Sequence, residues 1–188
     1  KYINLKHKKD KLKIGYFGKI SASKGSQILR ELILKYGRNI EFNIYSINKN
    51  IFKKLSCKTK KVDHKYVFKE MLKMDILLYV TNLDRKNKHA KYTSPLKIYE
   101  YISTLRPILY MPAGDLKNEL KNTIAIPFEN KFDFSNSLAK ILTLENHNTL
   151  IENTYKVSNS KTWDKRAENL RSIIYKNFKL NNDIANEI

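Results

Sequence analysis

The sequence is poor in cysteine, in acidic residues and in long apolar runs. Cys57 is the only cysteine among 188 residues, so the chain can form neither an internal disulfide nor a zinc cluster built on thiolates. The longest apolar runs, such as Ile76–Val80, are far shorter than the ~20 residues of a membrane-spanning helix. These absences argue against a disulfide-rich secreted scaffold, and we expect a cytoplasmic protein.

Several motifs that carry chemistry are also missing. The Walker A order G-x-x-x-x-G-K-[ST] and the dinucleotide fingerprint G-x-G-x-x-G do not occur. No Asp-x-Asp pair is present, and the four histidines are not spaced as a metal-binding set, although His64 and His89 could approach a ligand. We therefore expect no metal and no cofactor.

Positive charge is what the sequence has in excess. Lys and Arg number 37 and Asp and Glu number 18, which gives a net charge of +19. Such a balance predicts a polyanionic partner, which could be nucleic acid, anionic lipid or a phosphorylated small molecule. A bias toward Lys, Asn and Ile of the kind that AT-rich coding produces would give the same charge, so composition leaves these choices open.

Short apolar runs alternate with longer amphipathic stretches along the chain. We expect strands at 12–18, 40–47, 75–80, 107–111 and 123–126, and helices at 25–36, 65–74, 95–104, 132–144 and 162–178. This alternation predicts an α/β fold, a Rossmann-like parallel sheet flanked by helices. We divide the chain into a basic lead-in (1–10), a Rossmann-like nucleotide-sugar-binding domain (11–160) and a C-terminal amphipathic helix and tail (161–188).

The first candidate site is the turn at 18–25, where a predicted strand meets a predicted helix. Lys19 and Lys24 lie in this turn among small Ser, Ala and Gly residues. Ammonium groups beside a helix N-terminus are suited to binding phosphate. A solvated turn in a lysine-rich protein would look similar.

The second candidate site is the start of the helix predicted at 95–104. Ser94 is a good N-cap and Pro95 a good first helical residue, so the amides of Leu96 and Lys97 would face an anion outside the helix. Glu100 could accept two hydroxyl hydrogen bonds, as from a ribose. Together the two sites complement a nucleoside diphosphate.

These residues match a known pattern. The segment Ser94–Leu109 (SPLKIYEYISTLRPIL) resembles the S-P-L-K-x-x-E-Y-x-x-x-x-[KR]-P-[IV] signature of retaining group 1 (family 4-like) glycosyltransferases with the GT-B fold. Residues 18–25 are similar to the G-[RK]-x-x-x-x-K-G diphosphate loop of that family. Leu72–Val80 resembles its x-x-x-A-D-x-x-[LV] strand, and Thr162–Ala167 its S-W-x-x-R helix start.

The resemblance implies a role for each matching residue. Lys19, Lys24 and the amides near Leu96 and Lys97 would bind the donor diphosphate, and Glu100 would bind the ribose. The family's usual diphosphate-loop Arg is here Lys19, which keeps the charge without bidentate geometry. No catalytic residue is assigned in this chain.

The resemblance also marks a departure near the donor sugar. Many members have a glutamate eight positions before the ribose-binding one, and here that position is Tyr92. Tyr92, Thr93 and Ser94 are therefore candidates for contacts in the donor loop. In place of a metal, the lysines and helix amides would stabilise the departing diphosphate.

The context that the resemblance implies is a hexosyl-transferring enzyme of bacterial surface polysaccharide or lipopolysaccharide synthesis. Its substrate would be a nucleoside diphosphate sugar. Since the family carries its acceptor site on an N-terminal domain, we expect this chain to be the C-terminal fragment. Peripheral binding to the anionic inner face of the cytoplasmic membrane would account for the basic surface.

Two other readings stay open. The charge would suit a basic α/β nucleic-acid-binding module, although no helix-turn-helix, zinc-finger or RNP motif is present, and we do not expect nucleic acid as the partner. A catalytically silent, glycosyltransferase-like interaction domain is the other alternative, which the presence of Lys24 and Glu100 disfavours.

Overall fold

The computed structural model describes residues 10–47, 52, 54–84, 90, 96–143 and 147–185. Within them, one sheet of six strands has the order β3-β2-β1-β4-β5-β6, and each neighbouring pair is parallel. The strands are β1 (Leu12–Phe17), β2 (Ile40–Tyr45), β3 (Cys57–Lys60), β4 (Ile76–Tyr79), β5 (Ile108–Tyr110) and β6 (Ala125–Pro127). The α/β, Rossmann-like fold expected from the sequence is confirmed.

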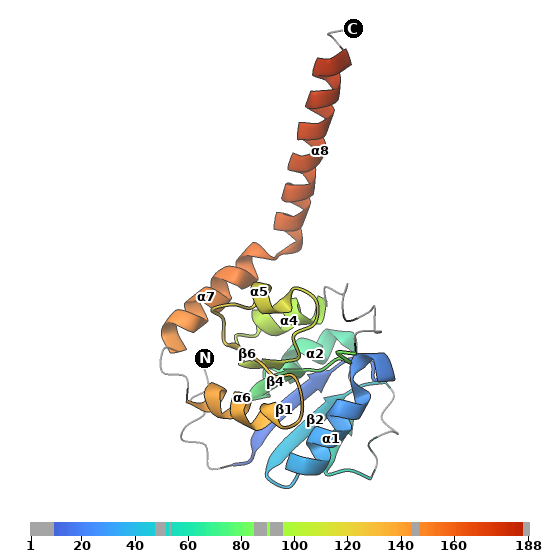
Figure 1. Cartoon of the computed structure of the whole chain (residues 1–188), viewed down its shortest axis with the longest axis vertical. Helices are drawn as coiled ribbons and strands as arrows, with labels where there is room; N and C mark the ends of the chain where they lie inside the picture. Colours follow the sequence, from blue (N-terminus) through green and yellow to red (C-terminus); the bar gives the residue numbers. More distant parts are fainter. Residues whose placement is uncertain are drawn as a thin grey trace.

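Helices cover both faces of the sheet (Figure 1). They are η2 (Ala22–Lys24), α1 (Ser26–Tyr36), α2 (His64–Met71), α4 (Leu96–Ser103), α5 (Leu116–Glu119), α6 (Asp133–Leu142), α7 (His147–Ser160) and α8 (Trp163–Ala185). Helices α1 and α6 pack with one buried cluster, and α2, α4 and α5 pack with the other. Because both faces are covered, the central strands are apolar along most of their length.

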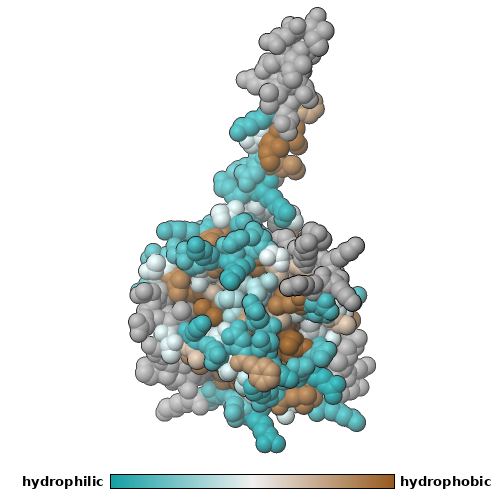
Figure 2. Space-filling model, in the orientation of Figure 1, coloured by the Kyte–Doolittle hydropathy of each residue, from teal (hydrophilic) through white to brown (hydrophobic). Residues whose placement is uncertain are grey.

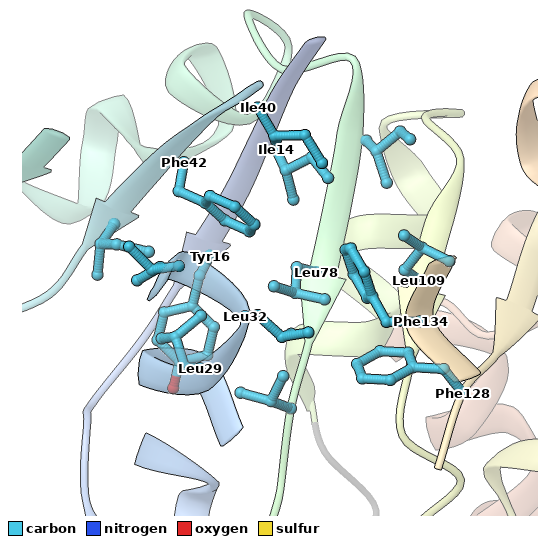
Figure 3. Packing of buried hydrophobic residues seen from close by; sticks show 14 of the residues in the cluster. Ile14, Tyr16, Leu29, Leu32, Ile40, Phe42, Leu78, Leu109, Phe128 and Phe134 are labelled. Carbon is cyan, nitrogen blue, oxygen red and sulfur yellow. The ribbon is translucent and has the colours of Figure 1, made fainter. Parts of the chain in front are cut away.

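The period of two along β1 divides its side chains between the two clusters. Ile14 and Tyr16 lie with Leu29 and Leu32 of α1, as Figure 3 shows. Phe17 lies in the opposite cluster, with α2 and α4. The end of β1 is thus held from both sides, which fixes the turn that follows it.

The structure adds elements that the sequence reading lacked. β3, with the sequence CKTK, is a short edge strand in which half-buried and exposed residues alternate, and lysines are common on such edges. α5 has only four residues, and α7 is a largely polar helix. The expected strands and helices are otherwise present, with ends shifted by at most three residues, except that the last helix continues to Ala185 instead of ending at 178.

α8 extends away from the rest of the molecule (Figure 1). The large apolar side chains described along it, from Trp163 at 71% to Phe178 at 66%, are exposed, and Figure 2 shows apolar surface on the projecting helix. Among the described residues, no helix is both long enough and apolar enough to cross a bilayer.

Candidate functional site

A cavity of about 450 Å³ lies where β1, β2 and β3 end. Its walls are formed by residues 17–19 after β1, 45–47 after β2, 61–64 before and at the start of α2, and Lys97 and Glu100 of α4. Ligands of open parallel sheets bind at this edge, and the volume is typical of small-molecule sites. The fold therefore brings both candidate sites to one cavity.

Tyr101 fixes α4 against the sheet. Its side chain is completely buried, and its hydroxyl accepts a hydrogen bond from the Phe17 N–H at 3.1 Å and donates one to the Leu78 carbonyl at 3.3 Å. These bonds tie α4 to the ends of β1 and β4. They hold the adjacent Glu100, and Lys97 one turn earlier, at the cavity.

The turn after β1 is held by backbone hydrogen bonds. Gly18 has φ of 141°, a value that side chains disfavour, and its N–H donates to the Tyr45 carbonyl at 2.9 Å. The Tyr16 hydroxyl donates to the Lys19 carbonyl at 3.0 Å. This arrangement places Lys19 in the cavity wall.

The second half of the turn packs against the end of β4. Gly25 has φ of 75°, and a Cβ there would lie 2.8 Å from the Thr81 nitrogen, so only glycine fits. The Ser21 carbonyl accepts the N–H groups of Lys24 and Ser26, each at 3.1 Å. The close packing at Gly25 sets where η2 ends and α1 begins.

The Lys97 side chain enters the cavity wall from α4. Its ammonium lies 4.8 Å from the centroid of the Tyr16 ring. Burial lowers the pKa of Lys97 to about 8; Lys24 contributes to this by repulsion, and Glu100 opposes it. Lys24 is therefore close enough for its charge to act on Lys97.

The far wall of the cavity is aromatic and polar. Phe17 and Tyr45 stack with ring centroids 4.3 Å apart, and the Tyr45 hydroxyl donates to Glu70 at 2.9 Å. Ser46 and residues 61–64 complete this wall. Sequence reasoning missed it, except for His64, because β3 was not expected and its following loop could not be placed.

The predicted site residues are partly brought together. Lys19, Lys97 and Glu100 line the cavity, and Lys24 acts on Lys97 from beside it. Leu96 instead lines a neighbouring groove of about 320 Å³ that shares Glu100 with the cavity and extends to the start of α8. The three candidates Tyr92, Thr93 and Ser94 lie outside the described residues, as does Pro95.

Within the described ranges, no three His, Cys, Asp or Glu side chains are grouped so that they could hold a metal ion. The cationic groups at the cavity, Lys19, Lys61 and Lys97, are accompanied by the carboxylates of Asp63 and Glu100. The lysines can bind an anion, and the carboxylate of Glu100 can accept hydrogen bonds from hydroxyl groups of the same ligand.

No family model and no curated protein matches the chain, but solved structures do. The C-terminal domain of a glycosyl transferase group 1 family protein (LpcC) from Francisella tularensis matches with a TM-score of 0.56 and 14% identity, over 80% of this chain and 85% of that one. The chain has the fold of a glycosyltransferase C-terminal domain. The catalytic domain of cholesterol-α-glucosyltransferase from Helicobacter pylori also matches, with a TM-score of 0.60 and 15% identity, over 81% of this chain and 100% of that one.

A third match concerns a longer chain. Anabaena Alr3699/HepE, in complex with UDP-glucose, matches with a TM-score of 0.63 and 14% identity, over 87% of this chain and 49% of that one. The present chain thus spans about half the length of HepE. The fold that the motif resemblance implied, that of a GT-B C-terminal domain, is confirmed.

Proposed function

We propose that the chain is the donor-binding domain of a glycosyltransferase and binds a nucleoside diphosphate sugar. The observation that carries the proposal is the convergence of Lys19, Lys97 and Glu100 on one cavity at the carboxyl ends of the strands. The lysines suit a diphosphate, and Glu100 suits the two hydroxyls of a ribose. HepE, which has the same fold, was solved with UDP-glucose.

The reaction we propose is a sugar transfer with retention at the anomeric carbon and without a metal. When the bond from the sugar to the diphosphate breaks, its electron pair stays on the diphosphate oxygen. Lys19, Lys24 and the N-terminal amides of α4 would stabilise this charge, as preorganised donors do for developing anions. The acceptor hydroxyl oxygen forms the new bond to the same carbon, and its proton passes to the departing diphosphate.

We further propose that an N-terminal domain supplies the acceptor site. α8 supports this, because Trp163, Leu170, Ile174 and Phe178 recur at helical spacing and are all exposed. A helix of 23 residues gains most of its stability in proteins by packing such a stripe. A domain contacting α8 would cover it.

The cellular setting is also a proposal. The net charge of +19 would favour a peripheral position on the anionic inner face of the cytoplasmic membrane. Enzymes of bacterial surface polysaccharide or lipopolysaccharide synthesis that use lipid-linked acceptors work at such a surface.

Calorimetric titration with UDP, GDP and ADP tests the proposal. We expect one of these nucleotides to bind, and we expect Lys24→Ala and Glu100→Gln each to weaken binding by about tenfold or more, the equivalent of about 1.4 kcal/mol. Lys140→Ala and Glu152→Gln are matched controls, because both residues are exposed on helices away from the cavity. A folded chain that binds none of the three nucleotides would contradict the proposal.

A further inference from the structure

Lys97 is a half-buried cation at the cavity, and no carboxylate among the described residues lies within ion-pair distance of it. Its pKa is lowered chiefly by burial, and within the described part of the chain its ammonium forms no ion pair with a carboxylate. Removing a charge from water is costly unless it is paired. The position therefore calls for an anion supplied from outside the chain.

Gly18 makes room for this ammonium. A Cβ added at Gly18 would lie 2.0 Å from the Lys97 Nζ, so any side chain there would displace the lysine. The turn after β1, which begins with Gly18 and Lys19, and the Lys97 side chain therefore meet at one point of the cavity. This contact joins the two halves of the proposed diphosphate site.

The groups around Lys97 set its charge. Tyr16 of β1 lies beneath it, and burial raises the pKa of that phenol far above its usual range. Lys24 of η2 repels the ammonium and Glu100 of α4 attracts it. Lys19 lines the same cavity, as do Asp63 and His64 across it.

We propose that the Lys97 ammonium binds the donor diphosphate directly, and that the site takes up a proton through Lys97 when the donor binds at alkaline pH. The proposal rests on nucleotide binding as proposed above. It adds a third lysine to the diphosphate site, acting through its side chain rather than its backbone amide.

The uptake of a proton by Lys97 on nucleotide binding follows from electrostatics. A pKa near 8 means that in the free chain Lys97 is largely neutral at about pH 9 and largely charged at about pH 7. A diphosphate beside it favours the charged form. Since the terminal phosphate of a nucleotide ionises near pH 6, that phosphate itself takes up no proton at about pH 9, and the Lys97→Met variant measures any uptake by the base.

The test is calorimetry of the bound nucleotide in two buffers that differ in ionisation enthalpy. Because Lys97 is largely neutral at about pH 9 and largely charged at about pH 7, we expect proton uptake on nucleotide binding at about pH 9 that is much smaller at about pH 7. Affinity should also fall by about tenfold per pH unit above the pKa of Lys97.

Three variants separate this role from a structural one. Lys97→Met should weaken binding at about pH 7 by about tenfold or more and abolish the uptake at about pH 9. Lys97→Arg should keep measurable affinity without uptake, because a guanidinium stays charged. Lys24→Met should move the uptake to higher pH, because it removes the charge that repels Lys97.

The outcomes distinguish this proposal from the function on which it rests. If a nucleotide binds and the parent chain takes up no proton at about pH 9, or Lys97→Met takes up as much as the parent, the role of Lys97 is overturned and the donor site stands. If none of UDP, GDP and ADP binds the folded chain, both proposals fail.

Discussion

Two side chains of α4 illustrate opposite uses of burial in the site. Tyr101 is buried with both hydrogen-bonding functions of its hydroxyl satisfied, by Phe17 and Leu78. Lys97 is half-buried beside an open cavity, and none of the described carboxylates, Glu100 included, lies within ion-pair distance of it. Burial of the Tyr101 side chain therefore stabilises the fold, whereas partial burial of the Lys97 ammonium destabilises it. Substitutions at these two positions should change the free energy of unfolding in opposite directions.

Tyr101→Phe should lower the free energy of unfolding by about 1–3 kcal/mol, because the Phe17 N–H and the Leu78 carbonyl would lose a buried partner. Urea denaturation checks this. Tyr155→Phe on α7 is the control. Because that side chain is 57% exposed, removal of its hydroxyl should change the free energy of unfolding little. Equal stability of Tyr101→Phe and the parent would show that α4 is held by packing alone.

Lys97→Met should raise the free energy of unfolding at about pH 7, by about 1–3 kcal/mol after allowance for partial solvation. The pKa of Lys97 is about 8 in the folded chain and 10.5 ordinarily, so between these values the unfolded state binds more protons. The stability of the parent therefore rises with pH in this window, and its deficit against Lys97→Met shrinks.

Urea denaturation at a series of pH values between about 7 and 9.5 measures that deficit. Lys140→Met, at an exposed position of α6, should show no gain at any pH. A Lys97→Met chain less stable than the parent at about pH 7 would mean that the ammonium stabilises the fold, contrary to this account.

Among the elements, α7 and α8 differ in how they contact the rest of the molecule. Thr154 of α7 is buried, and its hydroxyl accepts the Ile124 N–H at 3.1 Å. Along α8, Leu170 and Ile173 are exposed. α7 is thus part of the folded core, whereas the described apolar side chains of α8 form an exposed stripe.

Removal of residues 164–188 should leave urea unfolding and nucleotide affinity nearly unchanged, because the large apolar side chains described along α8, up to Phe178, are exposed and contribute little to the core. Removal from residue 147 onward, which deletes α7 as well, should destabilise the chain by exposing part of its core. A large loss of stability on the shorter deletion would contradict the exposed position of α8.

Elements with strong periodicity could be predicted from the sequence, and polar ones could not. The apolar residues of β1 and β4 form short runs typical of buried strands, and those of α1 recur at helical spacing. β3 has two lysines in four residues, and its place is set by pairing with β2 rather than by its own composition. The cavity wall at residues 61–64 follows β3, so it could not be foreseen either.

The candidate site was predicted in part for the same reason. Lys19, Lys97 and Glu100 belong to short motifs at strand–helix junctions, which parallel topology brings together. From the sequence, the backbone amide of Lys97 was predicted to bind the diphosphate. The role of its ammonium depends on a contact with Gly18, which only the folded chain reveals.

At the scale of the whole molecule, the net charge of +19 should act on any anionic surface. We expect the chain to sediment with vesicles of phosphatidylcholine and phosphatidylglycerol and not with phosphatidylcholine alone. Binding should weaken as salt is added, because screening shortens the range of the attraction. Salt-independent binding to neutral vesicles would instead indicate insertion of the apolar stripe of α8.

If the proposed function is right, a nucleoside diphosphate occupies the cavity beside Gly18, Lys97 and Glu100. Amide chemical-shift mapping of the isotopically labelled chain on titration with UDP, GDP and ADP tests it most directly. One nucleotide should shift resonances of the cavity residues together, with the exposed faces of α6 and α7 unaffected. Shifts scattered over surface lysines, with none concentrated at the cavity, would contradict the claim and identify a general polyanion-binding surface.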